Sequence, residues 1–233
     1  MILAFETSAK AASVALHDGA KLLGESYQNT GLTHSQTLMV MAEDLLKQCG
    51  LTPKDVTHVA VAAGPGSFTG VRIGVAAAKG FAWGLELPCY GVSTLEAMAV
   101  NRGIEGRAVV CACMDARRNQ VYNALFWADG AAPLRMTEDR AISLEDLGAE
   151  LRQLDAPIYL TGDGAGVACR ELPSDLPLMP LPPEHLQHQR AAGVAIVAAG
   201  LITQGISADA ESLQPNYLRL SQAEREKLER MQK

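Results

Sequence analysis

A glycine-rich segment carries the strongest chemical signal in the sequence. It reads Gly64-Pro-Gly-Ser-Phe-Thr-Gly-Val-Arg-Ile-Gly74 and joins an apolar run to a helical pattern. Glycines let a ligand approach the backbone, and Ser67 and Thr69 could cap a helix N-terminus, a geometry that can hold an anion. No Lys-Ser or Lys-Thr pair follows the last glycine, so this is not a Walker A loop. A tight strand-to-helix turn explains the local pattern equally well.

Polar side chains also follow two apolar runs. Glu6-Thr7-Ser8 comes after the first run, and Asp115-Ala-Arg117 comes after the run over 107–114. Ligands of α/β proteins commonly bind at such strand ends. The ordinary alternatives are a β-turn closed by hydroxyls and a solvated hairpin turn. The candidate ligand-loop residues are Thr7, Ser8, Gly64, Gly66, Ser67, Thr69, Arg72, Asp115 and Arg117.

The metal-binding and nucleophilic residue types form no recognisable catalytic set. The five histidines are scattered, and there is no GxSxG motif. The five cysteines include no CxxC. Cys111 and Cys113 share one face of a predicted strand. We interpret the cysteines as buried, reduced thiols rather than as a metal or redox site, and we expect neither a catalytic residue nor a metal site.

Composition limits the classes of partner. The chain has 233 residues, 48% of them hydrophobic and 20% charged, with a net charge of −6. These values fit a folded globular protein without the basic field of an autonomous nucleic-acid binder, so contact with nucleic acid would need a local patch or a basic partner. The N-terminus lacks an export signal, and the apolar runs fall short of the ~20 residues of a membrane span. We therefore expect a cytoplasmic protein that does not associate with membranes.

One order of elements occurs twice along the chain. The first half has strand patterns over 2–6, 12–17, 21–28, 56–63 and 89–92, and helical patterns over 34–48, 70–84 and 93–101. The second half has strand patterns over 107–114, 120–127, 134–142 and 157–161, and helical patterns over 143–154, after Gly166, over 185–204 and over 221–233.

This repeat predicts two β-β-β-α-β-α halves, an α/β fold with the two-lobed architecture of the actin, Hsp70 and sugar-kinase class. The predicted lobes are residues 1–102 and 103–233, and we expect the C-terminal helix to return to the first lobe. The alternative is a single α/β domain that starts with antiparallel strands.

The two longest helices of the first half carry contrasting patterns. Leu38, Met41 and Leu45 form an apolar stripe on the first helix. The second helix repeats Gly70, Gly74 and Ala78 at a spacing of four. Each glycine costs a helix up to ~1 kcal/mol, so close packing is the expected reason for this row. The row could pack against the core or against a partner's helix.

Five segments together resemble the bacterial TsaB (YeaZ) family. They are residues 2–8, 64–74, 91–95, 114–117 with Val121-Tyr122, and Pro215-Asn-Tyr-Leu-Arg219. The resemblance implies a non-catalytic accessory subunit that acts with TsaD, a catalytic homologue, and TsaE, an ATPase. These proteins transfer threonylcarbamoyl, from threonylcarbamoyl-adenylate, to the adenosine just after the anticodon in tRNAs reading codons that begin with A. The alternative function is a stand-alone ATPase or small-molecule kinase of the actin-like class.

The resemblance also bears on cofactors. TsaD carries an H-x-x-x-H metal pair, and its two positions fall on Thr94 and Met98 in this chain. Glu6 stands where the family usually has Asp. We therefore expect no cofactor to bind tightly to the isolated chain, and we expect ATP and a metal ion on the partner subunits.

The resemblance finally implies a four-helix bundle between helices 34–48 and 70–84 and their equivalents in TsaD. The same surface could form a homodimer when the partner is absent, and tRNA is expected to bind only through the complex. The implied interface residues are His34, Leu38, Met41, Leu45, Gly70, Val71, Gly74, Ala77, Ala78 and Phe81.

Overall fold

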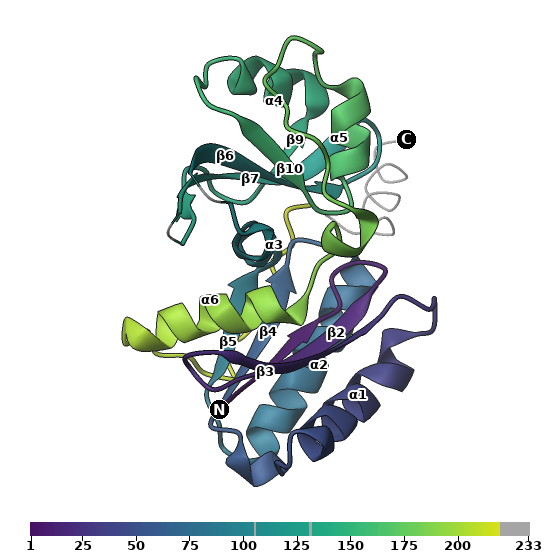
Figure 1. The fold of residues 1–233 in the computed structure, drawn as a ribbon. Coiled ribbons are helices and arrows are strands. Elements are labelled where there is room, and N and C mark those ends of the chain that lie inside the picture. Colours follow the sequence, from purple (N-terminus) through teal and green to yellow (C-terminus); the bar gives the residue numbers. More distant parts are fainter. Residues whose placement is uncertain (105, 131, 220–233) are drawn as a thin grey trace, which may run out of the picture.

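The computed structural model describes residues 1–104, 106–130 and 132–219 and shows two lobes, each built on one β-sheet (Figure 1). The first sheet has the order β3-β2-β1-β4-β5. Strands β1, β2 and β3 are antiparallel, whereas β4 and β5 run parallel to β1. Its strands are β1 (Ile2–Glu6), β2 (Ala12–His17), β3 (Leu22–Gln28), β4 (His58–Gly64) and β5 (Cys89–Ser93).

The second sheet repeats most of this arrangement. Its order is β10-β6-β7-β8, and β9 also pairs with β7. Strand β7 is antiparallel to β6, and β10 is parallel to it. The predicted two-lobed α/β fold is therefore confirmed. The strands are β6 (Arg107–Asp115), β7 (Gln120–Asp129), β8 (Leu134–Arg135), β9 (Arg140–Ser143) and β10 (Ile158–Thr161).

The strand predicted over 134–142 is wrong in one respect, because the structure has two short strands there, β8 and β9. The Thr137 hydroxyl between them accepts the Leu125 backbone N–H at 2.9 Å. A side chain thus takes the place of a backbone partner and interrupts the ladder.

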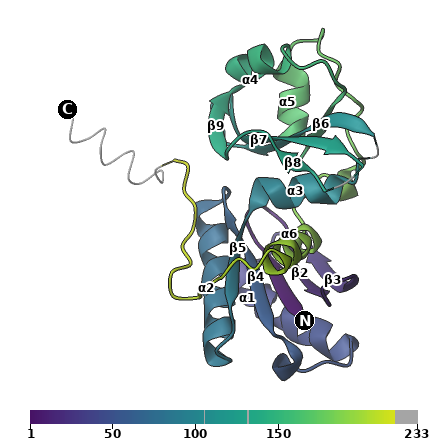
Figure 2. The ribbon, with the colours of Figure 1, turned by 90° about the vertical axis from the view of Figure 1, so that its left-hand side faces the viewer.

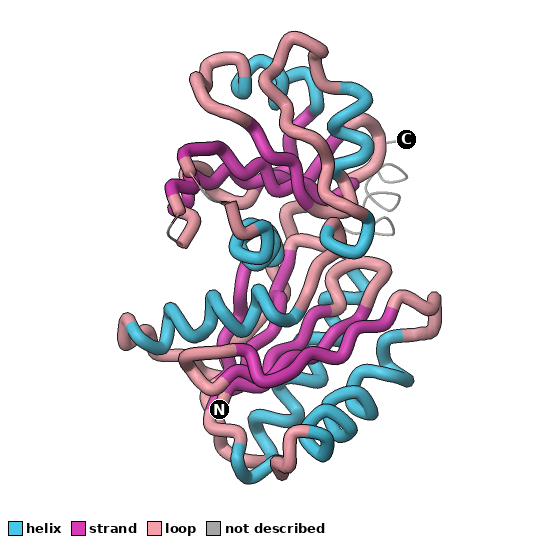
Figure 3. The backbone as a smooth tube through the Cα atoms, in the orientation of Figure 1, coloured by secondary structure: helices cyan, strands magenta, loops and turns pink. Residues whose placement is uncertain are grey.

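Helices cover both faces of the first sheet (Figure 3). Helices α1 (His34–Gln48) and α2 (Phe68–Gly84) cover one face, and α6 (Ala191–Thr203) covers the other. Alternation along β1 explains this, because Leu3 and Phe5 pack with α1 and α2 while Ile2 and Ala4 pack with α6. Both faces of this sheet are consequently buried.

The second sheet is covered in the same way. Helices α4 (Leu144–Leu151) and α5 (Ala165–Glu171) pack on one face, and α3 (Thr94–Arg102) packs on the other. Helices α3 and α6 meet between the lobes (Figure 1). The crossing is tight, because a Cβ on Gly193 would overlap the Ala97 carbonyl oxygen.

Three helix predictions need comment. The helix predicted over 185–204 begins only at Ala191, since Arg190 is extended and Glu184–Leu186 forms a separate 3-10 turn like Pro53–Asp55. The helix predicted over 143–154 ends at Leu151. The helix predicted over 221–233 lies outside the described residues. Among the residues that are described, no helix is long and apolar enough to cross a membrane.

Candidate functional site

A cavity of about 440 Å³ lies where the two lobes meet. Its walls come from loops far apart in the sequence. The first lobe contributes the loop after β1 (8–10) and the β4–α2 loop (65–68), and the second contributes the β6–β7 turn (114–117) and Asp163. Residues 216–219, near the end of the described chain, complete the lining. We call this cavity the interlobe cleft.

The structure brings five of the predicted ligand-loop residues together in this cleft. They are Ser8, Gly66, Ser67, Asp115 and Arg117. Ser67 is also the N-cap of α2, because its hydroxyl accepts the Gly70 N–H at 3.2 Å. Whether these five residues bind a ligand stays a prediction.

The other four predicted ligand-loop residues do not line the cleft. The Thr7 hydroxyl is buried and donates to the Gly70 carbonyl oxygen at 2.8 Å. Gly64 packs against the backbone of Asn216, since a Cβ on Gly64 would lie 2.5 Å from Asn216 O. Thr69 is exposed on α2, and Arg72 packs on aromatic rings rather than facing the cavity.

Glu6, at the end of β1, is a fully buried acid beside the cleft. Its Oε1 accepts the Ser8 N–H at 2.5 Å. Burial raises the pKa of Glu6 to about 7, and the nearby Asp163 charge adds to the rise, although the Ser8 groups oppose it. Within the described residues, the buried atoms Glu6 Oε2 and Ser8 Oγ have no hydrogen-bond partner of good geometry. The end of β1 therefore presents polar atoms whose bonding capacity is unused.

Asp163 contributes a second perturbed acid from the second lobe. Burial raises its pKa, while a hydrogen bond from Gln189 Nε2 at 2.8 Å lowers it. The sequence showed Asp163 within a Gly-Asp-Gly turn, which is too common a pattern to assign to a site. Folding brings this turn, which follows edge strand β10, and the loop after central strand β1 into the lining of the same cleft.

Sequence reasoning gave no role to the segment 216–219. The Asn216 N–H donates to Ala63 O at 2.6 Å, which ties the segment to the first lobe. Arg219 Nη1 donates to Ala116 O at 2.8 Å, which ties it to the second. Figure 2 shows the chain after α6 running beside α2 toward the upper lobe. The conspicuous Pro-Asn-Tyr-Leu-Arg motif was the available signal, but nothing in the sequence placed it at the cleft.

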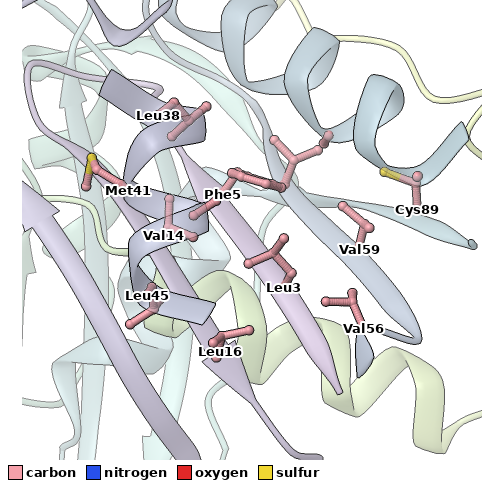
Figure 4. Close-up of a cluster of buried hydrophobic side chains, with 14 of the residues drawn as sticks. Leu3, Phe5, Val14, Leu16, Leu38, Met41, Leu45, Val56, Val59 and Cys89 are labelled. Carbon is pink, nitrogen blue, oxygen red and sulfur yellow. The ribbon is translucent and has the colours of Figure 1, made fainter. Parts of the chain in front are cut away.

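The predicted interface residues need a substantial correction. Leu38, Met41 and Leu45 point from α1 into the core of the first lobe, toward Phe5 and Val14 (Figure 4). The predicted interface residues that are buried inside this lobe, and so cannot form a docking surface, are Leu38, Met41, Leu45, Gly70, Val71, Gly74 and Ala78.

The Gly70–Gly74–Ala78 row is small because it packs on the protein's own first strand and loop. A Cβ on Gly70 would overlap Thr7 O, and one on Gly74 would overlap Thr7 Oγ1. The close approach inferred from the glycines is real, but it is internal. Of the predicted interface residues, only His34, Ala77 and Phe81 are half-buried, and their contact with a partner stays a prediction.

A second small-residue row lies on the outer face of α2. Ala76, Gly80 and Gly84 are exposed, and a Cβ on either glycine would meet nothing within 4 Å. Trp83, beside this row, is 79% exposed. On α1, Met39 and Val40 are 43% and 55% exposed. We call these six residues the outer helix face.

The residue types needed for a metal site do not gather. Among the described residues, no group of three or more His, Cys, Asp or Glu side chains is placed to hold a metal ion. Cys89, Cys111 and Cys113 are buried and free, as predicted, whereas Cys49 is half-buried and Cys169 is exposed. The expectation of uniformly buried thiols was therefore wrong for the last two.

Comparison with known proteins gives relatives over almost the whole chain. The chain is 32% identical over 225 residues to the tRNA threonylcarbamoyladenosine biosynthesis protein TsaB of Bacillus subtilis, covering 96% of each. It is 33% identical over 220 residues to the protein of the same name in Escherichia coli, covering 94% of each. Residues 28–148 match the family model for TsaD, tRNA N6-adenosine threonylcarbamoyltransferase.

Solved structures agree in fold. YeaZ from Pseudomonas aeruginosa superimposes with a TM-score of 0.79 at 29% sequence identity, covering 93% of this chain and 99% of that one. A second structure from the same organism, described as an uncharacterized protein with similarity to peptidase YEAZ, gives 0.80 at 29% identity, covering 94% and 99%.

Proposed function

Because this chain belongs to the TsaB family, we propose that it is a non-catalytic accessory subunit in the biosynthesis of threonylcarbamoyladenosine in tRNA. In this proposal the chain supports TsaD, which performs the transfer of threonylcarbamoyl, and works with the ATPase TsaE. The substrate is the adenosine just after the anticodon in tRNAs reading codons that begin with A.

The observation that carries the non-catalytic role lies on α3. The two positions aligned by resemblance with the histidines of TsaD are Thr94 and Met98, and both are buried. Met98 packs among Leu95, Val110 and Met114 in the core of the second lobe. A buried hydroxyl and a thioether in an apolar core are not the imidazole ligands that such a metal site requires. This supports placing the chemistry on the partner.

The outer helix face is the surface that we propose for the partner. Its small residues, Ala76, Gly80 and Gly84, leave the surface of α2 flat. Its large apolar side chains, Met39, Val40 and Trp83, are exposed to solvent. Flat rows and apolar knobs let helices approach closely and bury apolar area. The four-helix bundle is thus kept as a proposal, but through the outer side of α1 and α2. The same face would form a homodimer when TsaD is absent.

We propose that the isolated chain binds nucleotide weakly. Glu6 is buried and has a raised pKa, so it is poorly suited to holding the hydrated cation that accompanies nucleotide phosphates. One observation favours the alternative, a stand-alone ATPase or small-molecule kinase, because Ser8 and Asp115 do meet in one interlobe cleft. Calorimetry of the monodisperse chain with Mg-ATP separates the two, since a micromolar dissociation constant would favour the alternative.

Reconstitution tests the accessory role directly. The modification reaction is run with purified TsaD, TsaE, threonylcarbamoyl-adenylate and tRNA, and with each protein omitted in turn. We expect modification only when this chain, TsaD and TsaE are all present, and none with this chain alone. Robust modification by this chain alone, or undiminished modification without it, contradicts the proposal. Pull-down through a tag on TsaD reports whether the complex forms.

A further inference from the structure

Unpaired cations surround the mouth of the interlobe cleft, although the protein as a whole is acidic. Lys10, Arg117 and Arg219 line the cavity, and Arg118 follows in the same turn. None of the four makes an ion pair within the described part of the chain, whereas five other Lys and Arg side chains do. Local clusters of this kind attract polyanions even when the net charge, here −6, is negative.

The acids of the cleft do not neutralise these cations by pairing. Asp115 Oδ1 accepts the backbone N–H of Arg117 at 2.7 Å. Asp163 accepts a hydrogen bond from Gln189 at 2.8 Å and has a raised pKa. Both acids are thus engaged by neutral groups, and the guanidinium groups of Arg117 and Arg118 remain available to a ligand.

The turn between β6 and β7 displays its arginines at a conformational cost. Arg117, Arg118 and Asn119 all have left-handed backbones, with φ of 62°, 55° and 57°. Residues other than glycine rarely adopt this backbone conformation, and three such residues in a row are unfavourable. The turn exposes both arginines beside the cleft. Strain of this kind is often retained where a side chain serves binding.

An aromatic ring stands at the same mouth. Tyr217 lines the cavity and is 40% exposed. Phe68 packs against it with ring centroids 4.8 Å apart, and Arg72 Nε donates to its hydroxyl at 2.6 Å. The Arg72 guanidinium also lies 3.8 Å from the Phe68 ring centroid. Phe68 and Arg72, whose guanidinium also lies 5.5 Å from the Tyr217 ring centroid, therefore hold the ring in place, while 40% of the residue remains exposed.

We propose that the cleft mouth, formed by Lys10, Arg117, Arg118 and Tyr217, binds a single-stranded segment of RNA. The cations contact phosphates and one unstacked base stacks on Tyr217, the combination that single-stranded nucleic acid recognition uses. The proposal rests on the proposed function, because the tRNA is the RNA that the complex must hold. It gives this chain a direct part in substrate binding, beyond supporting TsaD.

The test measures tRNA binding by the assembled complex of this chain with TsaD and TsaE, using fluorescence anisotropy over a range of salt concentrations. Arg117→Gln/Arg118→Gln should weaken binding and flatten the slope of log K against log salt by about 1.4, because each phosphate contact to a single strand contributes about 0.7. Tyr217→Leu should weaken binding about five- to 150-fold, the range for one stacked base.

Three controls separate binding from folding. Tyr217→Phe keeps the ring and loses only the bond from Arg72, so binding should stay within about twofold of the wild type. Lys54→Gln/Arg170→Gln removes two exposed cations that do not line the cleft and form no ion pair within the described residues, and it should change neither affinity nor slope. Gel filtration and melting temperature show whether each variant assembles and folds.

The outcomes distinguish this proposal from the proposed function. Unchanged tRNA affinity and slope in a correctly assembled Arg117/Arg118 variant overturn the RNA surface and leave the accessory role standing. Altered AMP or ATP binding with unchanged tRNA binding also overturns it, in favour of a small-nucleotide site. If the wild type does not assemble with TsaD, the accessory role fails. Ultraviolet crosslinking of a labelled single-stranded RNA to the full chain alone then decides whether a Tyr217 peptide carries the label.

Discussion

Replacing one glycine on each side of α2 tests the corrected interface. Gly80 and Gly74 lie six residues apart on one helix, but a Cβ on Gly80 meets nothing within 4 Å. A Cβ on Gly74 would overlap Thr7 Oγ1 and lie 3.3 Å from Val61 Cγ2. Gly80→Leu and Gly74→Ala should therefore have opposite effects on folding and on partner binding.

Gly80→Leu should leave the free chain as stable as the wild type or more so. Removing a helical glycine gains up to ~1 kcal/mol. In a chain of this size that gain raises the melting temperature by about 2–4 °C. Against TsaD, the leucine would push two helices apart at a flat contact. Overpacking costs ~1–3 kcal/mol, which weakens the complex about five- to 150-fold.

Gly74→Ala should instead destabilise the free chain. Thr7 cannot move aside without losing its hydrogen bond to Gly70 O, and Val61 lies on a central strand. A net loss of about 2 kcal/mol, after the gain in helix propensity, lowers the melting temperature by about 4–8 °C. The affinity of the folded variant for TsaD should be unchanged.

Two measurements on each variant suffice, a melting curve of the isolated chain and a titration against TsaD by calorimetry. Gly80→Ala is the matched control, since it adds one methyl group to the outer face and should gain stability with little loss of affinity. The reasoning is refuted if Gly80→Leu binds TsaD like the wild type, or if Gly74→Ala melts like the wild type and loses affinity.

Three other variants probe the electrostatics and the packing between the lobes. Because the pKa of Glu6 is raised in the folded state, the carboxyl ionises in the unfolded chain at a lower pH than in the folded chain, and the free energy of unfolding falls from about pH 4.5 to 7. Glu6→Gln should therefore restore about 3 kcal/mol of stability at pH 8 but under about 1 kcal/mol at pH 5. Melting curves of the variant and the wild type at the two pH values measure this difference. Gly193→Ala should lower the melting temperature by several degrees, because its methyl would overlap Ala97 O where α3 crosses α6. Glu25→Gln should destabilise the chain by about 1–3 kcal/mol in urea unfolding, because Glu25 pairs with Arg190 and accepts the Ala192 N–H; a shift below 0.5 kcal/mol would contradict that role.

Sequence patterns predicted the elements of the first lobe well, because its strands alternate between two buried faces and its helices carry clear end signals. Ser67, one of two expected caps, begins α2 at Phe68 rather than at the predicted residue 70. In the second lobe, Ser143 caps α4 as expected. The pattern was less informative where hydrophobicity is uniform. Helix α6 is apolar on almost every side, so only the extended backbone of Arg190 fixes its start.

The sequence could not identify which side of α2 is open. Small residues at a spacing of four form one row through Gly74 and another through Gly80, and composition is nearly the same in both. The buried row is decided by Thr7, which lies over sixty residues away in the chain. The same limit applies to Tyr217, whose place beside Phe68 depends on the path of the chain after α6 rather than on any local signal.

The position of α6 also constrains the order in which the protein can fold during synthesis. The face of the first sheet that includes Ile2, Ala4 and Ala60 is covered by α6, whose buried residues extend to Ala198. All five strands of that sheet have been made by Ser93. At 5–20 residues per second, the ribosome needs roughly 5–20 s to extend the chain from Ser93 to Ala198, where the buried part of α6 is complete. During this interval the second lobe is synthesised while an apolar surface of the first stays open. We therefore expect the nascent chain to bind chaperones and products truncated before α6 to aggregate.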